Sequence, residues 1–194
     1  MRILRAENHK RMPWKSGGGE TTEIAVFPEG AGLSDFDWRV SMARVDGDGP
    51  FSSFPGIDRT IAILEGAGIV LDVAGNAARR LTAEDEPHRF PADRPTSAAL
   101  IGGSVLDFNV MSRRGRVAHS VHGISASLSA GPGGVRLVFC ASGSLNIRMD
   151  GADLTLERHD AALLDTGEEA RIAPAGNGRG YLVTFAAETE ILGG

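Results

Sequence analysis

The chain of 194 residues carries 20 Lys and Arg residues against 25 Asp and Glu residues, a formal net charge of −5. Hydrophobic residues make up 42% of the sequence and charged residues 23%, values typical of a globular protein and not of a disordered or fibrous one. The densest basic run, Arg113, Arg114 and Arg116, is short, so no basic field is available to attract a phosphate backbone and nucleic-acid binding is disfavoured.

The N-terminus, MRILRAENHKRMPW, has no continuous apolar region of a secretory signal, and no later segment approaches the ~18 apolar residues of a membrane span. We therefore expect a soluble protein without membrane association, with the cytoplasm as its compartment. The single Cys140 cannot form an internal disulfide. It lies in the apolar run VRLVFCA, which favours a buried structural thiol over a nucleophile.

Residues 13–23 read PWKSGGGETTE, with three consecutive glycines after Trp14, Lys15 and Ser16. A phosphate-binding loop requires glycines before a Lys-Ser/Thr pair that opens a helix. Here the order is reversed, and the TTEIAVF that follows has the pattern of a strand. The segment is interpreted either as a plain turn, or as a mobile loop or nest of backbone N–H groups beside a small anion.

Two segments alternate apolar and polar side chains with period two, which predicts strands with two distinct faces. WRVSM at 38–42 places Arg39 and Ser41 on one face, and VLDFNVM at 105–111 places Asp107 and Asn109 on one face. The polar face of each strand is expected to look either to solvent or into a cavity. The side chain of Arg59, in FPGIDRT, is likewise expected to look either to solvent or into a cavity.

The same period continues near 145–149, 154–156 and 181–185, with the turn-like clusters MDGAD and PAGNGRG between the runs. This spacing predicts an all-β sandwich or barrel. The stretch 113–134 lacks a long apolar pattern and is expected to be an irregular junction. ILEGAGIVLDV and FCASGSLNIRM share a pattern of strand, glycine-containing turn and strand, from an internal duplication or by chance.

The five histidines occur in no H-x-H or H-E-x-x-H motif. His119 and His122 do not make a metal site by themselves, because a catalytic metal generally needs three protein ligands, and they are expected in a solvated loop. No G-x-S-x-G motif of a hydrolase is present. No metal and no other cofactor are expected.

Four motifs occur together and in order: PWKSGGGETTEIAVFP, FDWRVSMARV, DGPFSSFPGIDRTIAILEGAG and LDFNVMSRRG. They resemble the HutD/Ves family over about residues 12–116. The resemblance implies a bicupin, two cupin-like β-barrels packed in one compact chain over 1–194. The first barrel, with the N-terminal segment, is expected at 1–115 and the second at 116–194.

The resemblance also implies a bacterial protein encoded near histidine-utilisation enzymes, with no established catalytic activity. Two departures from the family pattern stand out. Ser16 replaces an Asn that is common in the family, so a contact that needs the amide is in doubt. The metal-binding cupin motif is missing, so metal-dependent cupin chemistry is not expected.

With this resemblance, the polar residues of the first half are interpreted as a binding site for a small anionic metabolite, such as urocanate, in a protein that modulates histidine utilisation. Trp14 would form a flat wall, and Lys15 with Arg59 or Arg39 would hold the anion. The remaining candidates are the hydrogen-bonding Thr21, Ser41 and Ser52, and the floor residues Asp107 and Asn109.

Two alternatives remain open. A metal-free isomerase or lyase would use Glu20, Glu23 or Asp107 as its acid and base, with Lys15 as an electrostatic stabiliser. A protein-interaction module would present loops and have no pocket. Edges of cupin-like sheets can pair, so a homodimer is allowed, but no surface is singled out by the sequence.

Overall fold

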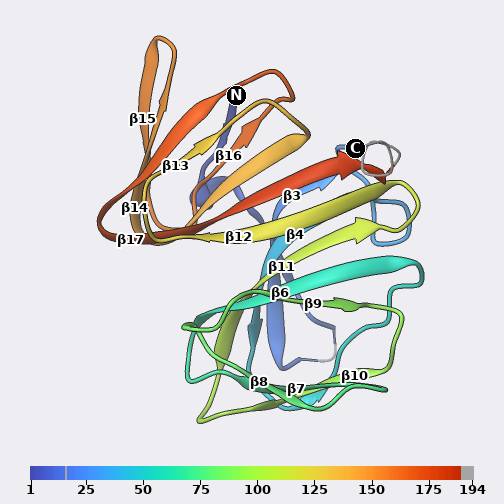
Figure 1. The fold of residues 1–194 in the computed structure, drawn as a ribbon. Helices are drawn as coiled ribbons and strands as arrows, with labels where there is room; N and C mark the ends of the chain where they lie inside the picture. The colour runs from blue at the N-terminus through green and yellow to red at the C-terminus, as the bar shows by residue number, and fades with distance from the viewer. Residues whose placement is uncertain (16, 189–194) are drawn as a thin grey trace. The chain divides into compact units, whose positions relative to one another are not determined.

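The computed structural model describes residues 1–15 and 17–188, which form strands and one short 3-10 helix, η1 (Ala6–Asn8) (Figure 1). The expected all-β class is confirmed. Among the residues described, no helix is long and apolar enough to cross a membrane. The chain divides into two compact units: a central unit, Lys10–Val117, and a flanking unit that joins Met1–His9 to the chain from Ala118 onward.

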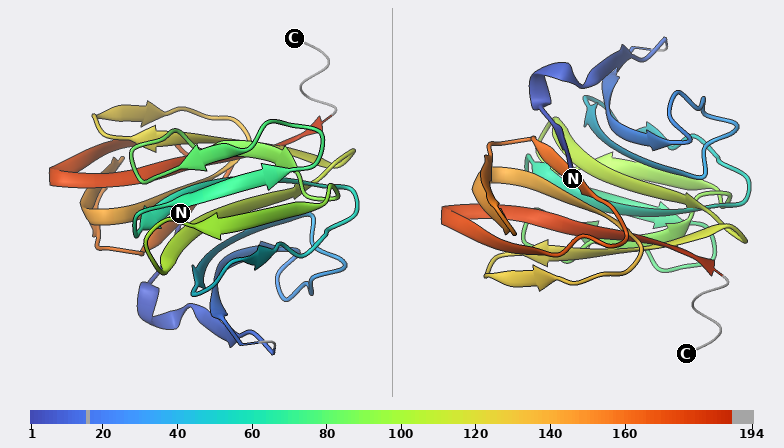
Figure 2. Two further views of the ribbon diagram at one scale, coloured as in Figure 1. Left: turned by 90° about the horizontal axis from the view of Figure 1, so that it is seen from below. Right: turned by 90° about the horizontal axis from the view of Figure 1, so that it is seen from above.

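Two antiparallel sheets build the central unit and lie in two layers (Figures 1 and 2). The six-stranded sheet has the order β2 (Lys10–Pro13), β3 (Gly19–Phe27), β4 (Trp38–Val45), β11 (Val105–Arg113), β6 (Ile57–Glu65) and β9 (His88–Pro91). The four-stranded sheet has the order β5 (Gly49–Pro50), β10 (Thr96–Leu100), β7 (Ile69–Val73) and β8 (Arg79–Leu81).

The main core of the central unit lies between these two sheets. Ile61 and Ile63 of β6 and Val105 of β11 pack in one buried cluster with Ile69 and Leu71 of β7. Because successive side chains of a strand point to opposite faces, these contacts identify which face of the six-stranded sheet is turned inward. We call it the inner face.

A seven-stranded sheet builds the flanking unit. Its main path is β1 (Arg2–Leu4), β16 (Ala161–Leu164), β14 (Val135–Met149), β17 (Ala170–Ala187) and β12 (Val117–Ile124), with β13 (Leu128–Ala130) on β17 and β15 (Ala152–Leu156) on β14. Val138, Leu145 and Ile172 belong to its buried core. Within the part of the chain that is described, none of the three sheets closes into a barrel.

The first nine residues lie in the flanking unit and not in the N-terminal half where the sequence placed them. The reason is strand pairing across the length of the chain, because β1 (Arg2–Leu4) pairs antiparallel with β16, from Leu163 back to Ala161. Asp160 adds to this connection, since its carboxylate accepts hydrogen bonds from Arg5 Nη1 at 2.6 Å and from the backbone N–H of Ala6 at 2.8 Å.

The strands expected from period-two alternation are present as β4, β11, β14, β15 and β17. Two expectations are wrong. The stretch 113–134 is not irregular, since it holds β12 and β13. The glycine turn expected in FCASGSLNIRM is a bulge inside β14, where the pairing with β17 shifts between Cys140 and Ser144 and Gly143 has φ 61°. Pairing with one long partner strand on both sides of Gly143 keeps the chain extended.

Candidate functional site

Strand register brings several of the sequence-selected residues to the inner face of the central unit, five of them on β4, β6 and β11. On β11, Asn109 is level with Ser41 of β4, and Met111 is level with Arg39 of β4 on one side and Arg59 of β6 on the other. Asp107 follows two residues earlier on the same face. Two arginines therefore flank a strand that carries an amide and a carboxyl group.

These polar side chains are buried: Asp107 is 1% exposed, Asn109 2%, Arg39 5% and Arg59 7%. The alternative of a solvated strand face is therefore wrong. The reason is that the polar residues share their face with Val105 of β11 and Ile61 of β6, which pack against the four-stranded sheet. The face that the alternation marked as polar is the one that the second sheet covers.

A chain of hydrogen bonds links three of these residues. The Nε and Nη2 atoms of Arg59 both donate to Oδ1 of Asn109, the Nε contact at 2.8 Å. The amide of Asn109 in turn donates from Nδ2 to Oδ1 of Asp107 at 2.5 Å. The neutral amide thus provides hydrogen bonds to both the buried guanidinium and the buried carboxyl group. These bonds hold the two groups in place, because leaving buried polar groups without hydrogen bonds would be costly.

Arg39 has a different partner, since its Nε donates to Oε2 of Glu23 at 2.7 Å. Glu23 is level with Ser41, and the pairing of β3 with β4 shifts by one residue just after it, between Glu23 and Ala25. Glu20, the other acid considered from the sequence, is level with Arg44 and lies on the opposite face of β3. Of the two glutamates, only Glu23 lies on the inner face.

Several hydrogen-bond donors of the cluster have no partner among the residues that the structure describes. Within the described residues, the guanidinium of Arg39 donates only from Nε, and that of Arg59 donates only from Nε and Nη2. The hydroxyl of Ser41, also buried, makes no side-chain hydrogen bond to the residues described. Free donors of two cations and a hydroxyl on one sheet face are groups suited to binding a carboxylate.

Burial changes the acid-base properties of the cluster. It raises the pKa of Asp107 to about 6, opposed by the positive charge of Arg59 and by hydrogen bonds from Asn109 and from the backbone of Ala43. Burial also lowers the pKa of Arg59 to about 10, opposed by Asp107 and reinforced by Arg39. Arg59 therefore remains a cation at neutral pH. The carboxyl group of Asp107, in contrast, titrates at a pH just below neutral.

Two aromatic rings enclose Arg59, although no pattern in the sequence singles them out. The guanidinium carbon lies 4.3 Å from the ring centroid of Phe51 and 5.8 Å from that of Phe90. Aromatic faces attract cations, so the rings stabilise the charge of Arg59 and hold its plane. Phe51 lies in the motif DGPFSSFPG, but nothing in its local pattern indicates an arginine partner from β6.

The glycine-rich segment is the turn of a β-hairpin that joins β2 to β3. The backbone N–H of Trp14 donates to the carbonyl of Gly19 at 3.0 Å, and the indole Nε1 donates to Oγ1 of Thr21 at 2.8 Å. Thr21 is level with Ala43, on the inner face. The plain-turn interpretation describes this geometry, and Ser16, where the chain departs from the family pattern, lies outside the described residues.

Lys15 and Ser52 are exposed, and no hydrogen bond or ion pair within the described part of the chain joins either of them to the cluster. Lys15 lies on the hairpin turn, and Ser52 follows Phe51 in the loop between β5 and β6. The structure therefore brings together Thr21, Arg39, Ser41, Arg59, Asp107 and Asn109. Trp14 is connected to this set through Thr21.

His119 and His122 lie on β12 and not in a loop; His119 is buried beside Phe185, and His122 is exposed. Among the residues described, no three His, Cys, Asp or Glu side chains are placed to hold a metal ion together. Cys140 is fully buried, as expected, and burial together with Glu157 and Asp160 raises the pKa of its thiol to about 11. Such a thiol is a poor nucleophile.

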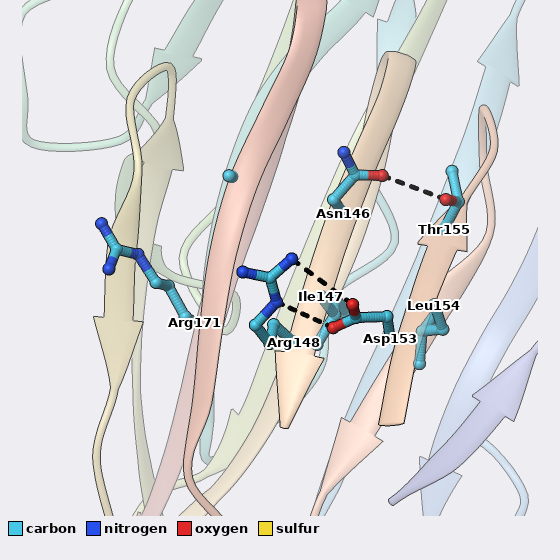
Figure 3. A pocket seen from close by; sticks show the side chains of 8 residues that line it. Asn146, Ile147, Arg148, Asp153, Leu154, Thr155 and Arg171 are labelled. Atoms are coloured by element: carbon cyan, nitrogen blue, oxygen red, sulfur yellow. Dashed lines mark hydrogen bonds and ion pairs between the residues drawn. The ribbon is translucent and has the colours of Figure 1, made fainter. Parts of the chain in front are cut away.

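A groove of about 400 Å³ lies on the β14–β15 hairpin of the flanking unit (Figure 3). Its lining residues are Asn146, Ile147, Arg148, Asp153, Leu154, Thr155, Arg171 and Ala173. Arg148 and Asp153 form an ion pair at 2.9 Å, and their side chains are 74% and 67% exposed. Water screens such a pair, so this groove has weaker electrostatics than the buried cluster.

Comparison with known proteins places the chain in a class and then in a family. A cupin 2 conserved barrel domain protein from Leptotrichia buccalis, 12% identical, superposes over 91% of this chain and 92% of its own with a TM-score of 0.57. The chain is thus an all-β protein of cupin-like fold.

The sequence model of the HutD family matches residues 6–182, and the chain belongs to this family. An uncharacterised 21.2 kDa protein in the hutC 3' region of Pseudomonas putida is 35% identical over 173 residues, 87% of this chain and 89% of the relative. Protein Ves of Citrobacter koseri is 34% identical over 157 residues, 78% and 81% of the two chains. The structure of HutD from Pseudomonas fluorescens SBW25, 32% identical, covers 96% of this chain and 98% of that one with a TM-score of 0.83.

Proposed function

We propose that the protein binds a small carboxylate metabolite at the inner face of the central unit. The observation that carries this proposal is the pair of buried guanidinium groups, Arg39 and Arg59, whose terminal N–H groups are only partly used by the described residues. Ser41 adds a hydroxyl on β4, the strand that also carries Arg39, at the level of Glu23 on β3. Buried donors held in place by their own partners bind an anion without much loss of side-chain entropy.

The ligand is proposed to come from histidine utilisation, with urocanate as the first candidate, and its binding to modulate that pathway. Family membership and the hutC-region relative from Pseudomonas putida support this choice. In architectural terms, we propose a bicupin in which each compact unit corresponds to one cupin-like barrel. The division into two units and the cupin-like fold support this arrangement.

One observation favours a second candidate, a metal-free enzyme. Asp107 combines deep burial with a pKa of about 6, a combination suited to a general acid or base. An isomerase or lyase of this kind would consume its ligand. A binding protein would return the ligand unchanged.

A thermal unfolding screen with urocanate, histidine and formylated carboxylates tests the proposal. A ligand present at 100 times its Kd stabilises the folded protein by about 2.7 kcal/mol, which should raise the Tm of a chain of this size by roughly 5–10 °C. Chromatography of the recovered ligand distinguishes the two candidates. Turnover that disappears in Asp107→Asn would establish the enzyme, and an unchanged Tm with every carboxylate would exclude both.

Substitutions locate the site. Ser41→Ala removes one buried donor with little change of volume and should weaken ligand binding about tenfold, the usual cost of losing a hydrogen bond to a charged group. Arg39→Lys keeps the positive charge beside Glu23 but loses the guanidinium fork, and should weaken binding at least as much. Ser52→Ala, at an exposed serine in the loop that carries Phe51, is the matched control and should bind normally.

A further inference from the structure

Among the charged residues joined by the hydrogen bonds of the cluster, positive and negative side chains are equal in number before any ligand arrives. Arg39 and Arg59 supply two positive charges, and Glu23 and Asp107 supply two carboxyl groups. A ligand carboxylate would add a third negative charge to this buried set. Like charges repel strongly where water is excluded. Protonation of one of the cluster's own carboxylates is therefore favoured when the ligand binds.

The two carboxyl groups are not equivalent in their contacts. Glu23 has a direct ion pair with the guanidinium of Arg39, at 2.7 Å. Asp107 is held by the neutral amide of Asn109, and within the described residues it has no ion pair of 4 Å or less with an arginine. Asp107 is also the more deeply buried of the two, at 1% exposure. It is therefore the carboxyl group whose charge is stabilised least.

We infer that the cluster takes up one ligand carboxylate together with one proton, and that Asp107 holds this proton in the complex. The inference rests on the proposed function and defines its ligand class, a carboxylate whose affinity depends on a protonated aspartic acid in the protein. The raised pKa of Asp107, about 6, places this exchange near neutral pH. Anion binding would raise it further.

Charged and titratable groups reach this region from several strands. Glu23 comes from β3, Arg39 from β4 and Arg59 from β6, and Lys10 on β2 is level with Glu23. From β9 comes His88, which stacks on Phe90 and contacts Arg79, and burial and Arg79 lower its pKa. The side chains from β7, β8 and β10 in the buried cluster are apolar: Ile69, Leu71, Val73, Leu81 and Ala98. His88, the one imidazole among the groups named, is therefore controlled for in the experiment.

Acetate is a suitable probe because it stays ionised above pH 6 and has no second titrating group. The Kd for acetate is measured by NMR titration from pH 5.5 to 8.5, and proton uptake is measured directly in weakly buffered solution. For the wild type, we expect the Kd to rise about tenfold per pH unit above neutral pH, with about one proton taken up per acetate bound.

Asp107→Asn mimics the protonated side chain. This variant should bind acetate with a Kd that is independent of pH and without proton uptake, and at pH 8 it should bind at least tenfold more tightly than the wild type. His88→Gln is the matched control. It should retain the pH dependence, since Asp107 and Glu23 are both intact.

The outcomes separate the two ideas. Acetate binding with a Kd independent of pH in the wild type, or proton uptake that persists in Asp107→Asn, would overturn the role of Asp107 and leave the carboxylate site standing. If acetate bound neither the wild type nor Asp107→Asn at any pH, the carboxylate site itself would be rejected and the proton exchange with it.

Discussion

Asp107 shows how a single residue can carry an energetic cost that its neighbours only partly offset. Its carboxyl group is buried, and its pKa of about 6 lies above the value of about 3.9 for an aspartate in an unfolded chain. The folded protein therefore binds this proton more tightly than the unfolded chain does. The contribution of Asp107 to stability is present in full below pH 4, falls as the pH rises from 4 to 6, and is lost above that range.

Asp107→Asn should therefore stabilise the ligand-free protein at neutral pH. We expect its free energy of unfolding to exceed that of the wild type by on the order of 1–3 kcal/mol at pH 7.5, with a smaller difference at pH 4. Urea denaturation at the two pH values measures this. Asp153→Asn, at an exposed carboxylate, should change stability little at either pH. A less stable Asp107→Asn at pH 7.5 would show that the ionised carboxylate is the favoured form.

At the scale of the elements, the hairpin of β2 and β3 depends on three glycines in two different ways. Gly17 and Gly18 have φ values of 73° and 78°, in the left-handed region that favours glycine, and a side chain there would meet open space. At Gly19 a Cβ atom would lie 2.5 Å from the carbonyl oxygen of Arg44 and 2.7 Å from the ring of Trp14. The turn conformation is required at the first two positions, and close packing at the third.

Gly19→Ala should accordingly be more harmful than Gly18→Ala. The first must move a strand backbone or the indole and should cost roughly 1–3 kcal/mol, whereas the second costs about 1 kcal/mol for the left-handed conformation alone. Urea denaturation, followed through the fluorescence of Trp14 and Trp38, compares the two variants. Equal losses would mean that Trp14 moves aside freely and does not form a fixed wall.

At the scale of the whole molecule, the N-terminal segment belongs to a unit otherwise built from the other end of the chain. Asp160 accepts hydrogen bonds from Arg5, from the backbone of Ala6 and from the backbone of Glu157. Although burial acts to raise the pKa of Asp160, these hydrogen bonds and the charge of Arg5 outweigh it, and the pKa lies below its ordinary value. The carboxylate therefore stabilises the folded state at neutral pH.

Asp160→Ala should loosen this connection, with a loss of roughly 2–4 kcal/mol because three donors lose a buried acceptor. Hydrogen exchange should accelerate in residues 2–6 and in β16, and should remain slow in β4 and β11 of the central unit. Asp153→Ala in the same flanking unit is the control and should leave the exchange of residues 2–6 unchanged. Unaltered exchange at those residues in Asp160→Ala would show that pairing with β16 alone holds the segment.

The sequence by itself determined which residues share a strand face, because side chains alternate along a strand whatever lies beyond it. For this reason the sequence correctly predicted that Arg39 and Ser41 share one strand face and that Asp107 and Asn109 share another. The apolar setting of Cys140 predicted its burial equally well. The motifs identified the family, and with it the cupin-like fold, since four segments in order are far more specific than any one of them.

Only the tertiary structure decided which face the second sheet would cover, which glutamate would reach Arg39, and which rings would enclose Arg59. It also places the first nine residues in the flanking unit and shows strands in the stretch 113–134, where an irregular junction was expected. The physical reason is that alternation is local, whereas register and pairing join residues far apart in the chain. Glu23 and Glu20 differ by three positions, an odd number, and pairing with β4 turned only Glu23 toward the two arginines.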